Sequence, residues 1–93
     1  MSTDHTLLAA ITASWPALLD TIGPINLRLQ RILDGCWPIA VVHDIVIIAV
    51  PSVFHLRQLE NQDNRVCIED ILLAHHERRL WITVRQVMRP RTA

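Results

Sequence analysis

The stretch Ile39 to Leu59, IAVVHDIVIIAVPSVFHLRQL, decides how this chain folds. Its first half predicts two nearly all-apolar strands, at 39–43 and 45–50. The pair His43-Asp44 separates them and is a candidate two-residue hairpin turn, although it lacks the Asn-Gly or Asp-Gly sequence typical of such turns. A strand pair this apolar cannot remain exposed to water, so we expect the flanking segments to cover it.

The second half of this stretch marks the end of the sheet and the start of a helix. Pro51 has no N–H to donate to a central strand, so the second strand is expected to end before it. Ser52 has the side chain of a helix N-cap, and a helical pattern follows over 53–60. The polar cluster at 61–64, Asn-Gln-Asp-Asn, then predicts a turn.

Two helices are expected before the hairpin. From Thr6 to Ile22 apolar residues recur at three- and four-residue steps, as on the buried face of a helix, at Leu7, Ile11, Trp15, Leu18 and Ile22. Pro16 interrupts this pattern, so either one helix kinks there or Ser14 caps a new helix with proline in its first turn. A second helix follows Gly23-Pro24 and ends at Gly35, with an apolar side formed by Ile25, Leu29, Ile32, Leu33 and Cys36.

The C-terminal third predicts a helix and a last strand. The helix ends near Glu77 and has an inner face formed by Ile68, Ile71, Leu72 and His75. From Leu80 to Arg85 the residues alternate, which predicts a strand with a core side of Leu80, Ile82 and Val84. The expected fold is α+β: one two-layer domain over 1–93 in the order ααββααβ, with a small three-stranded sheet packed on helices. Residues 1–5 and 88–93 are expected to fray or to act as linkers.

Composition narrows the possible functions. Hydrophobic residues make up 51% of the 93 residues, a high share for a small domain, so some apolar surface is expected to face a partner. Nine basic residues balance nine acidic ones, which disfavours nucleic-acid binding through overall charge. Cys36 and Cys67 stand alone, as buried reduced thiols do. The start MSTDHT does not resemble a signal peptide, and no apolar run approaches the roughly 20 residues of a membrane span, so we expect a cytoplasmic protein.

Polar residues that could carry chemistry have simpler explanations. His75, His76 and His55 invite a metal site, but no carboxylate or cysteine lies at ligand spacing, which favours solvated or interface histidines. Ser52, His55 and Asp63 could act as nucleophile, base and orienting acid, yet no nucleophile elbow surrounds the serine. With two glycines, the chain has no P-loop, dinucleotide fingerprint or nucleic-acid-clamping Gly-x-x-Gly loop. We therefore expect no catalytic residue, no cofactor and no metal.

The last strand contains the best candidate for a binding surface. Alternation places Trp81, Thr83 and Arg85 on the face opposite the core side. The hairpin is also apolar on both faces, whereas a two-layer domain covers only one of them. An uncovered apolar face with a central tryptophan and a nearby arginine is typical of a protein interface. The alternatives are that helices or the tail cover this face, or that Arg85 merely lies over the indole.

Basic charge is concentrated towards the C-terminus, at Arg78, Arg79, Arg85, Arg89 and Arg91. These arginines are weaker candidates for a nucleic-acid contact. Without exposed aromatic residues between them, beyond Trp81, a solvated rim is the favoured interpretation.

A longer pattern resembles a known family over roughly Leu7 to Val87. The run L-x-x-I-x-x-x-W-P-x-L-L-x-x-I is similar to the opening of the C-terminal domain of many bacterial DNA polymerase III gamma/tau (DnaX) subunits, here formed by Leu8, Ile11, Trp15, Pro16, Leu18, Leu19 and Ile22. The resemblance continues through the second helix and ends with the closing strand. Between these two it includes Pro38, Asp44, the segment 50–55 (VPSVFH), Leu59-Glu60 and Ile68-Glu69. The N-terminal domain of the replication initiator DnaA shares part of this pattern.

The resemblance implies a KH-like α+β domain without glycines that clamp nucleic acid. It implies a non-catalytic domain of the replicative clamp loader, whose partners are the DNA polymerase III catalytic subunit or the replicative helicase, with a homo-oligomer also possible. The chain would then be a terminal domain separated from the ATPase module of gamma/tau. The parent assembly is a DNA-directed DNA polymerase, a transferase. Two alternatives remain open, a KH-like nucleic-acid-binding module and a DnaA-type domain in replication initiation.

Overall fold

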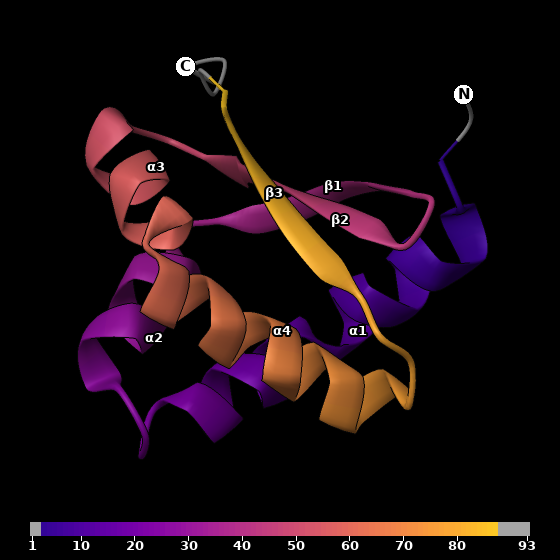
Figure 1. The fold of residues 1–93 in the computed structure, drawn as a ribbon, viewed down its shortest axis with the longest axis horizontal. Helices are drawn as coiled ribbons and strands as arrows, with labels where there is room; N and C mark the ends of the chain where they lie inside the picture. The colour runs from indigo at the N-terminus through magenta and orange to yellow at the C-terminus, as the bar shows by residue number, and fades with distance from the viewer. Residues whose placement is uncertain (1–2, 88–93) are drawn as a thin grey trace, which may run out of the picture.

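A computed structural model describes residues 3–87 of the chain. Within that range four helices and three strands follow one another in the order ααββααβ, which confirms the predicted fold class. The sheet forms one layer and the helices lie mainly on one side of it (Figure 1). The sheet is mixed, because β1 and β2 pair antiparallel while β2 and β3 pair parallel.

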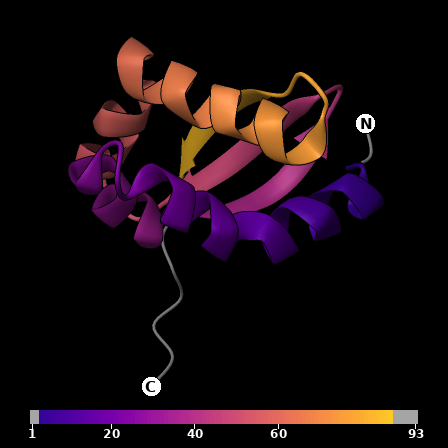
Figure 2. The same cartoon turned by 90° about the horizontal axis from the view of Figure 1, so that it is seen from below.

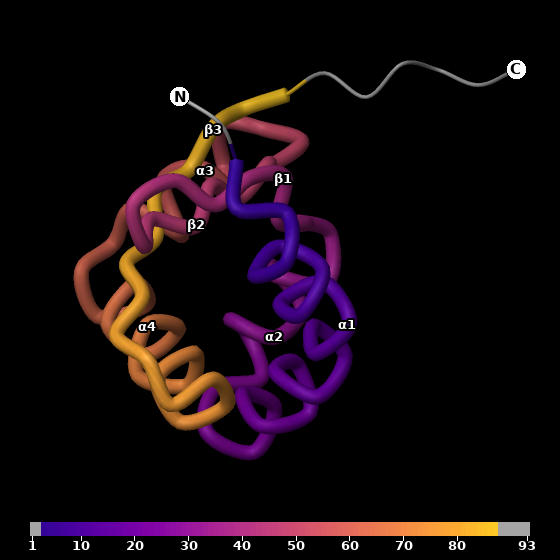
Figure 3. The backbone as a smooth tube through the Cα atoms, turned by 90° about the vertical axis from the view of Figure 1, so that its right-hand side faces the viewer, coloured from indigo at the N-terminus to yellow at the C-terminus, as the bar shows by residue number. Residues whose placement is uncertain are grey.

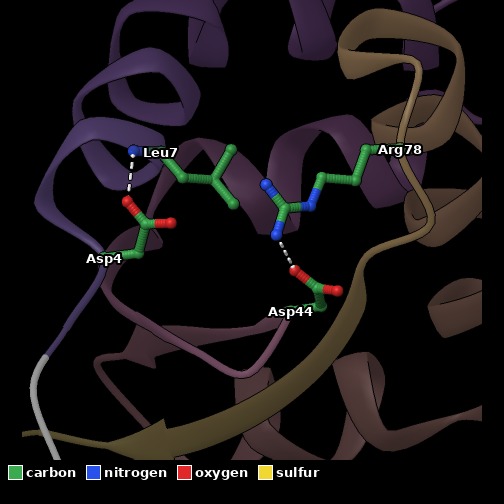
Figure 4. Close-up of polar contacts among 4 residues, drawn as sticks. All are labelled: Asp4, Leu7, Asp44 and Arg78. Atoms are coloured by element: carbon green, nitrogen blue, oxygen red, sulfur yellow. Dashed lines mark hydrogen bonds and ion pairs between the residues drawn. The ribbon is translucent and has the colours of Figure 1, made fainter.

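Helix α1 (His5–Ile22) starts at a capping aspartate. The Asp4 carboxylate accepts a hydrogen bond from the N–H of Leu7 at 3.0 Å (Figure 4), which satisfies one of the free donors of the first turn. The N–H of Asp4 also donates to the carbonyl of Val41 at 2.7 Å, so the helix start is tied to the hairpin. Asp4 and His5 therefore belong to the folded part of the chain, contrary to the expectation for 1–5. Residues 88–93 lie outside the described range.

Two features of the N-terminal half differ from or refine the prediction. Pro16 lies inside α1, so one continuous helix forms and Ser14 does not cap a new one. Helix α2 (Leu27–Asp34) begins at the cap Asn26, whose side chain accepts from the N–H of Leu29 at 3.1 Å. Ile25 therefore precedes the helix and is 67% exposed, so its assignment to the apolar side of that helix was wrong.

The hairpin of β1 (Trp37–Val42) and β2 (Ile45–Val50) turns at the predicted residues. His43 and Asp44 have φ angles of 50° and 64°, the pair of positive values found in the type I′ turns of two-residue hairpins. Strand β1 starts two residues earlier than expected and contains Pro38. Proline is tolerated there because β1 is an edge strand, and the pairing register shifts between Pro38 and Ala40.

Two residues separate the hairpin from helix α3 (Val53–Glu60), and only Asn61 separates α3 from helix α4 (Gln62–His76). The hydroxyl of Ser52 accepts from the N–H of His55 at 3.2 Å, which confirms the predicted cap. The side chain of Asn61 accepts from the N–H groups of Asp63 and Asn64, at 3.0 and 3.3 Å. The prediction of a turn over 61–64 was therefore wrong, because Asn61 caps α4 and the next three residues form its first turn.

Strand β3 (Trp81–Gln86) returns beside β2 and runs parallel to it. The connection between parallel strands has to cross a face of the sheet, and here α3 and α4 form it. Seen from the side of the helices, α1 and α4 lie in front of the strands (Figure 2). The core fills the space between the two layers and includes Ile11, Leu18, Leu29, Leu33, Val46, Ile48, Ile68 and Leu72.

Two histidines connect the end of α4 to α1. His76 Nε2 lies 3.0 Å from the hydroxyl of Ser14, and His75 Nε2 lies 3.2 Å from that of Thr21. His75 is exposed, so its predicted place on the inner face of the helix was wrong. Burial, and next the neighbouring His75, lower the pKa of His76 below its ordinary value of 6.5, so the folded state favours the neutral ring.

The stability of the domain should therefore fall in mild acid. The unfolded chain takes up the His76 proton first, so the contribution of this group is complete above about pH 6.5 and is lost as the pH falls towards the lower folded pKa. We expect the free energy of unfolding to decline less for His76→Gln than for the wild type between about pH 6.5 and 5. Urea unfolding at a series of pH values measures this. A pH dependence in His76→Gln equal to that of the wild type would contradict the assignment.

Glu69 on α4 is a charged side chain that the fold buries, with 6% of its surface exposed. Its carboxylate accepts a hydrogen bond from the N–H of Ile82 at 2.9 Å. The N–H of the preceding residue, Trp81, donates instead to the carbonyl of Asp44 in the hairpin turn. Because successive N–H groups of a strand point to opposite sides, Glu69 satisfies a donor on the edge of β3 that faces away from β2.

Removing this acceptor should destabilise the domain. Glu69→Ala leaves a buried N–H without a partner, which costs about 1–3 kcal/mol, whereas Glu69→Gln keeps an acceptor oxygen and should cost less. Urea unfolding measures the difference, and hydrogen exchange at the Ile82 amide should accelerate in the alanine variant. The control is Asp70→Ala, because the exposed Asp70 only pairs with Arg79 at 3.7 Å and such pairs contribute at most about 1 kcal/mol. Equal losses in the Glu69→Ala and Asp70→Ala variants would contradict this role.

Candidate protein interface on the outer face of the sheet

Strand β3 presents the three predicted residues on one face. Trp81, Thr83 and Arg85 are exposed, whereas Leu80 and Ile82 between and beside them are buried. Residues that pair directly across neighbouring strands share a face, so the register extends this surface onto β2. The pairs are Ile45 with Trp81, Ile47 with Thr83, and Ala49 with Arg85. We call the face that carries these residues the outer face.

The register also adds β1 to the outer face. Val42 pairs with Ile45, Ala40 with Ile47, and Trp37 with Ala49. Sequence reasoning missed Trp37 as a member of this surface, because the strand was expected to begin only at Ile39. The register shift near Pro38 decides on which face Trp37 lies, and alternation alone does not reveal such a shift. The outer face is thus mainly apolar and has a tryptophan in each of its edge strands.

The outer face is open to solvent around Trp81 and Ile45, whereas Ala49 on the same face is fully buried. The tube view shows the strands at one end of the molecule, with α1, α2 and α4 extending from their other side (Figure 3). Trp81 keeps 51% of its surface exposed and Ile45 keeps 39%. One alternative was that the domain's own helices cover this face. The exposure of Trp81 excludes that alternative for this residue. Two large apolar side chains exposed side by side, as Trp81 and Ile45 are, are typical of a place where another molecule binds.

An arginine does lie over the indole of Trp81, but it is Arg79 rather than Arg85. The guanidinium carbon of Arg79 lies 5.4 Å from the ring centroid, within the range of a cation–π contact. Arg79 precedes the strand and also reaches Asp70 on α4 at 3.7 Å. Tryptophan and arginine are the residues most enriched at energetic centres of protein interfaces, so their contact marks the most promising point of the outer face.

The C-terminal arginines do not all act as free cations. Arg78 forms an ion pair with Asp44 at the hairpin turn (Figure 4), and Arg79 pairs with Asp70. Arg85 lies on the outer face beside Ala49. Arg89 and Arg91, the other predicted candidates for nucleic-acid contacts, lie outside the described residues. Ion pairing of Arg78 and Arg79 lowers the positive charge that a phosphate backbone would meet at this end of β3.

The polar residues considered for chemistry have structural partners. The hydroxyl of Ser52 lies 2.6 Å from Nδ1 of His55, and the same oxygen caps α3. Asp63 lies in the first turn of α4, and within residues 3–87 its carboxylate forms no hydrogen bond to His55, so the three do not form a triad. Within residues 3–87, histidine, cysteine and carboxylate side chains form no group of three that could hold a metal ion. Burial raises the pKa of the Cys36 thiol to about 11, which makes it a poor nucleophile at neutral pH.

Comparison with models of protein families, with curated proteins and with solved structures finds no significant match to this chain. A search of the described helices finds none with the length and apolar character needed to cross a bilayer.

Proposed function

We propose that this chain is a non-catalytic protein-interaction domain of a replicative clamp-loader subunit of the gamma/tau type. In this proposal the domain works in the cytoplasm and tethers the loader to the DNA polymerase III catalytic subunit or to the replicative helicase. The gamma/tau part rests on the sequence resemblance. The interaction part rests on one observation, the half-exposed Trp81 beside the exposed Ile45 on the outer face of the sheet.

The magnitude of the available burial supports an interaction role. The exposed half of a tryptophan offers roughly 100 Å² of mostly apolar surface, and burying it contributes about 2–3 kcal/mol. A side chain with this effect qualifies as an energetic centre of an interface. Ile45 and Ile47 next to it extend the apolar area, and Arg79 and Arg85 supply charged groups at its rim. The proposal assigns no catalytic residue, since Ser52, His55 and His76 already serve caps and helix contacts.

The direct test mixes the purified chain with each proposed partner separately. We expect a complex with the polymerase catalytic subunit or with the helicase, and we expect Trp81→Ala to weaken it by about tenfold or more. The exposed site makes this variant nearly neutral for folding, which circular dichroism verifies. The matched control is Val66→Ala, because Val66 on α4 is also an exposed apolar residue, 42% exposed, and belongs neither to the outer face nor to a groove. Biolayer interferometry with the immobilised chain measures the affinity of the wild type and of each variant for the partner.

The salt dependence of binding separates this proposal from a nucleic-acid-binding module. A complex held by the outer face should change little in affinity between low and moderate salt, because apolar burial dominates it. Retention on single-stranded DNA that falls steeply with salt, together with no binding to polymerase or helicase, would instead favour the KH-like nucleic-acid module. Self-association that depends on Trp81 would show that a second copy of the chain occupies this face.

A further inference from the structure

A groove between α2 and α3 is separate from the outer face. It has a volume of ≈ 540 Å³ and is lined by Leu27, Arg28, Arg31, Ile32, Phe54 and His55. This volume lies within the usual range of binding pockets, about 300–1,000 Å³. All of its lining residues come from the two helices and none from the sheet, so a ligand can occupy this groove while the outer face is bound.

The apolar part of the groove is open to solvent. Phe54 is 59% exposed and Leu27 is 52% exposed, while Ile32, which also lines the groove, is buried. The cap at Ser52 fixes the start of α3, and the ring of Phe54 meets that of His55 edge to face, with 5.7 Å between centroids. Two large apolar side chains are thus held in place at a concave site without being covered, which costs free energy in water.

The charged part of the groove is positive. Arg28 and Arg31 are three residues apart on α2 and therefore lie on the same side of the helix. The lining contains no carboxylate. Arg31 also borders a neighbouring hollow with Asp20 and Asp34, yet neither arginine forms an ion pair within residues 3–87. This differs from Arg78 and Arg79, both of which have carboxylate partners.

We propose that this groove binds an acidic amphipathic helix from a partner protein. Apolar side chains of such a helix, spaced by three or four residues, fit over Leu27, Ile32 and Phe54, and flanking carboxylates pair with Arg28 and Arg31. Charge complementarity selects an acidic segment over a neutral or basic one. A single-stranded nucleic acid fits less well, because the groove offers one exposed aromatic ring for stacking and is otherwise aliphatic. The argument does not depend on the clamp-loader assignment.

The experiment selects the ligand from a displayed library of random peptides of about 16 residues, enough for roughly four helical turns. The bait is the full chain, and the double variant Arg28→Glu/Arg31→Glu is used for counter-selection. We expect the enriched peptides to combine apolar residues at helical spacing with Asp or Glu. A synthetic copy of the most enriched peptide is then titrated by fluorescence anisotropy against the wild type and the variants, and thymidine homopolymer DNA is titrated in parallel.

The variants give opposite expectations for the two surfaces. Phe54→Ala and Arg28→Glu/Arg31→Glu should each weaken the peptide by about tenfold or more, whereas Trp81→Ala and the exposed control Arg65→Glu on α4 should stay within about twofold. Circular dichroism verifies that each variant is folded. The proposal is overturned if no peptide is enriched whose binding the double variant abolishes, or if the enriched peptides lack acidic residues. It is also overturned if the chain binds the DNA instead of a peptide and the double variant abolishes that binding. Loss of binding only in Trp81→Ala would assign the peptide to the outer face, which also overturns it.

Discussion

The fold depends on the hydrogen bonds that strand β2 makes on both of its sides. β1 reaches it through a two-residue turn and has to be antiparallel, whereas β3 arrives through two helices and is parallel. That second connection carries α3 and α4 back across the sheet, and α1 and α2 complete the helical layer on the same side (Figure 2). The exposure of Trp81 on the outer face is thus a result of how the chain connects its strands, and the hairpin makes that face mainly apolar.

Features that depend on neighbours in sequence were predictable. Ser52 caps α3 where it was expected, β2 ends before Pro51, and Gly35 ends α2. The errors occurred where one polar residue can serve two local structures. Asn61 can start a turn or cap a helix with the same side-chain oxygen, and the packing of α4 on the core decides for the cap. Ile25 fits the apolar period of α2, but the cap at the next residue excludes it from the helix.

The candidate surfaces were predictable only in part, for a related reason. Alternation along β3 is enough to place Trp81 on the face away from the core. Alternation does not predict that Arg79 lies over the indole, because Arg79 precedes the strand and follows the end of α4. The groove between α2 and α3 brings together residues far apart in the sequence, so no periodic pattern indicates it. Local chemistry thus identifies single exposed residues, while shape and charge complementarity arise from packing.

The bond between Glu69 and the N–H of Ile82 has a consequence for solubility. An open strand edge is a template on which a foreign strand can add, and a chain rich in Val and Ile is prone to such growth. On β3 an incoming strand would have to displace a buried carboxylate from its donor. On β1 the opposite edge is interrupted by Pro38 and a register shift. Each margin of the sheet thus has one feature that disfavours the addition of a strand from another molecule.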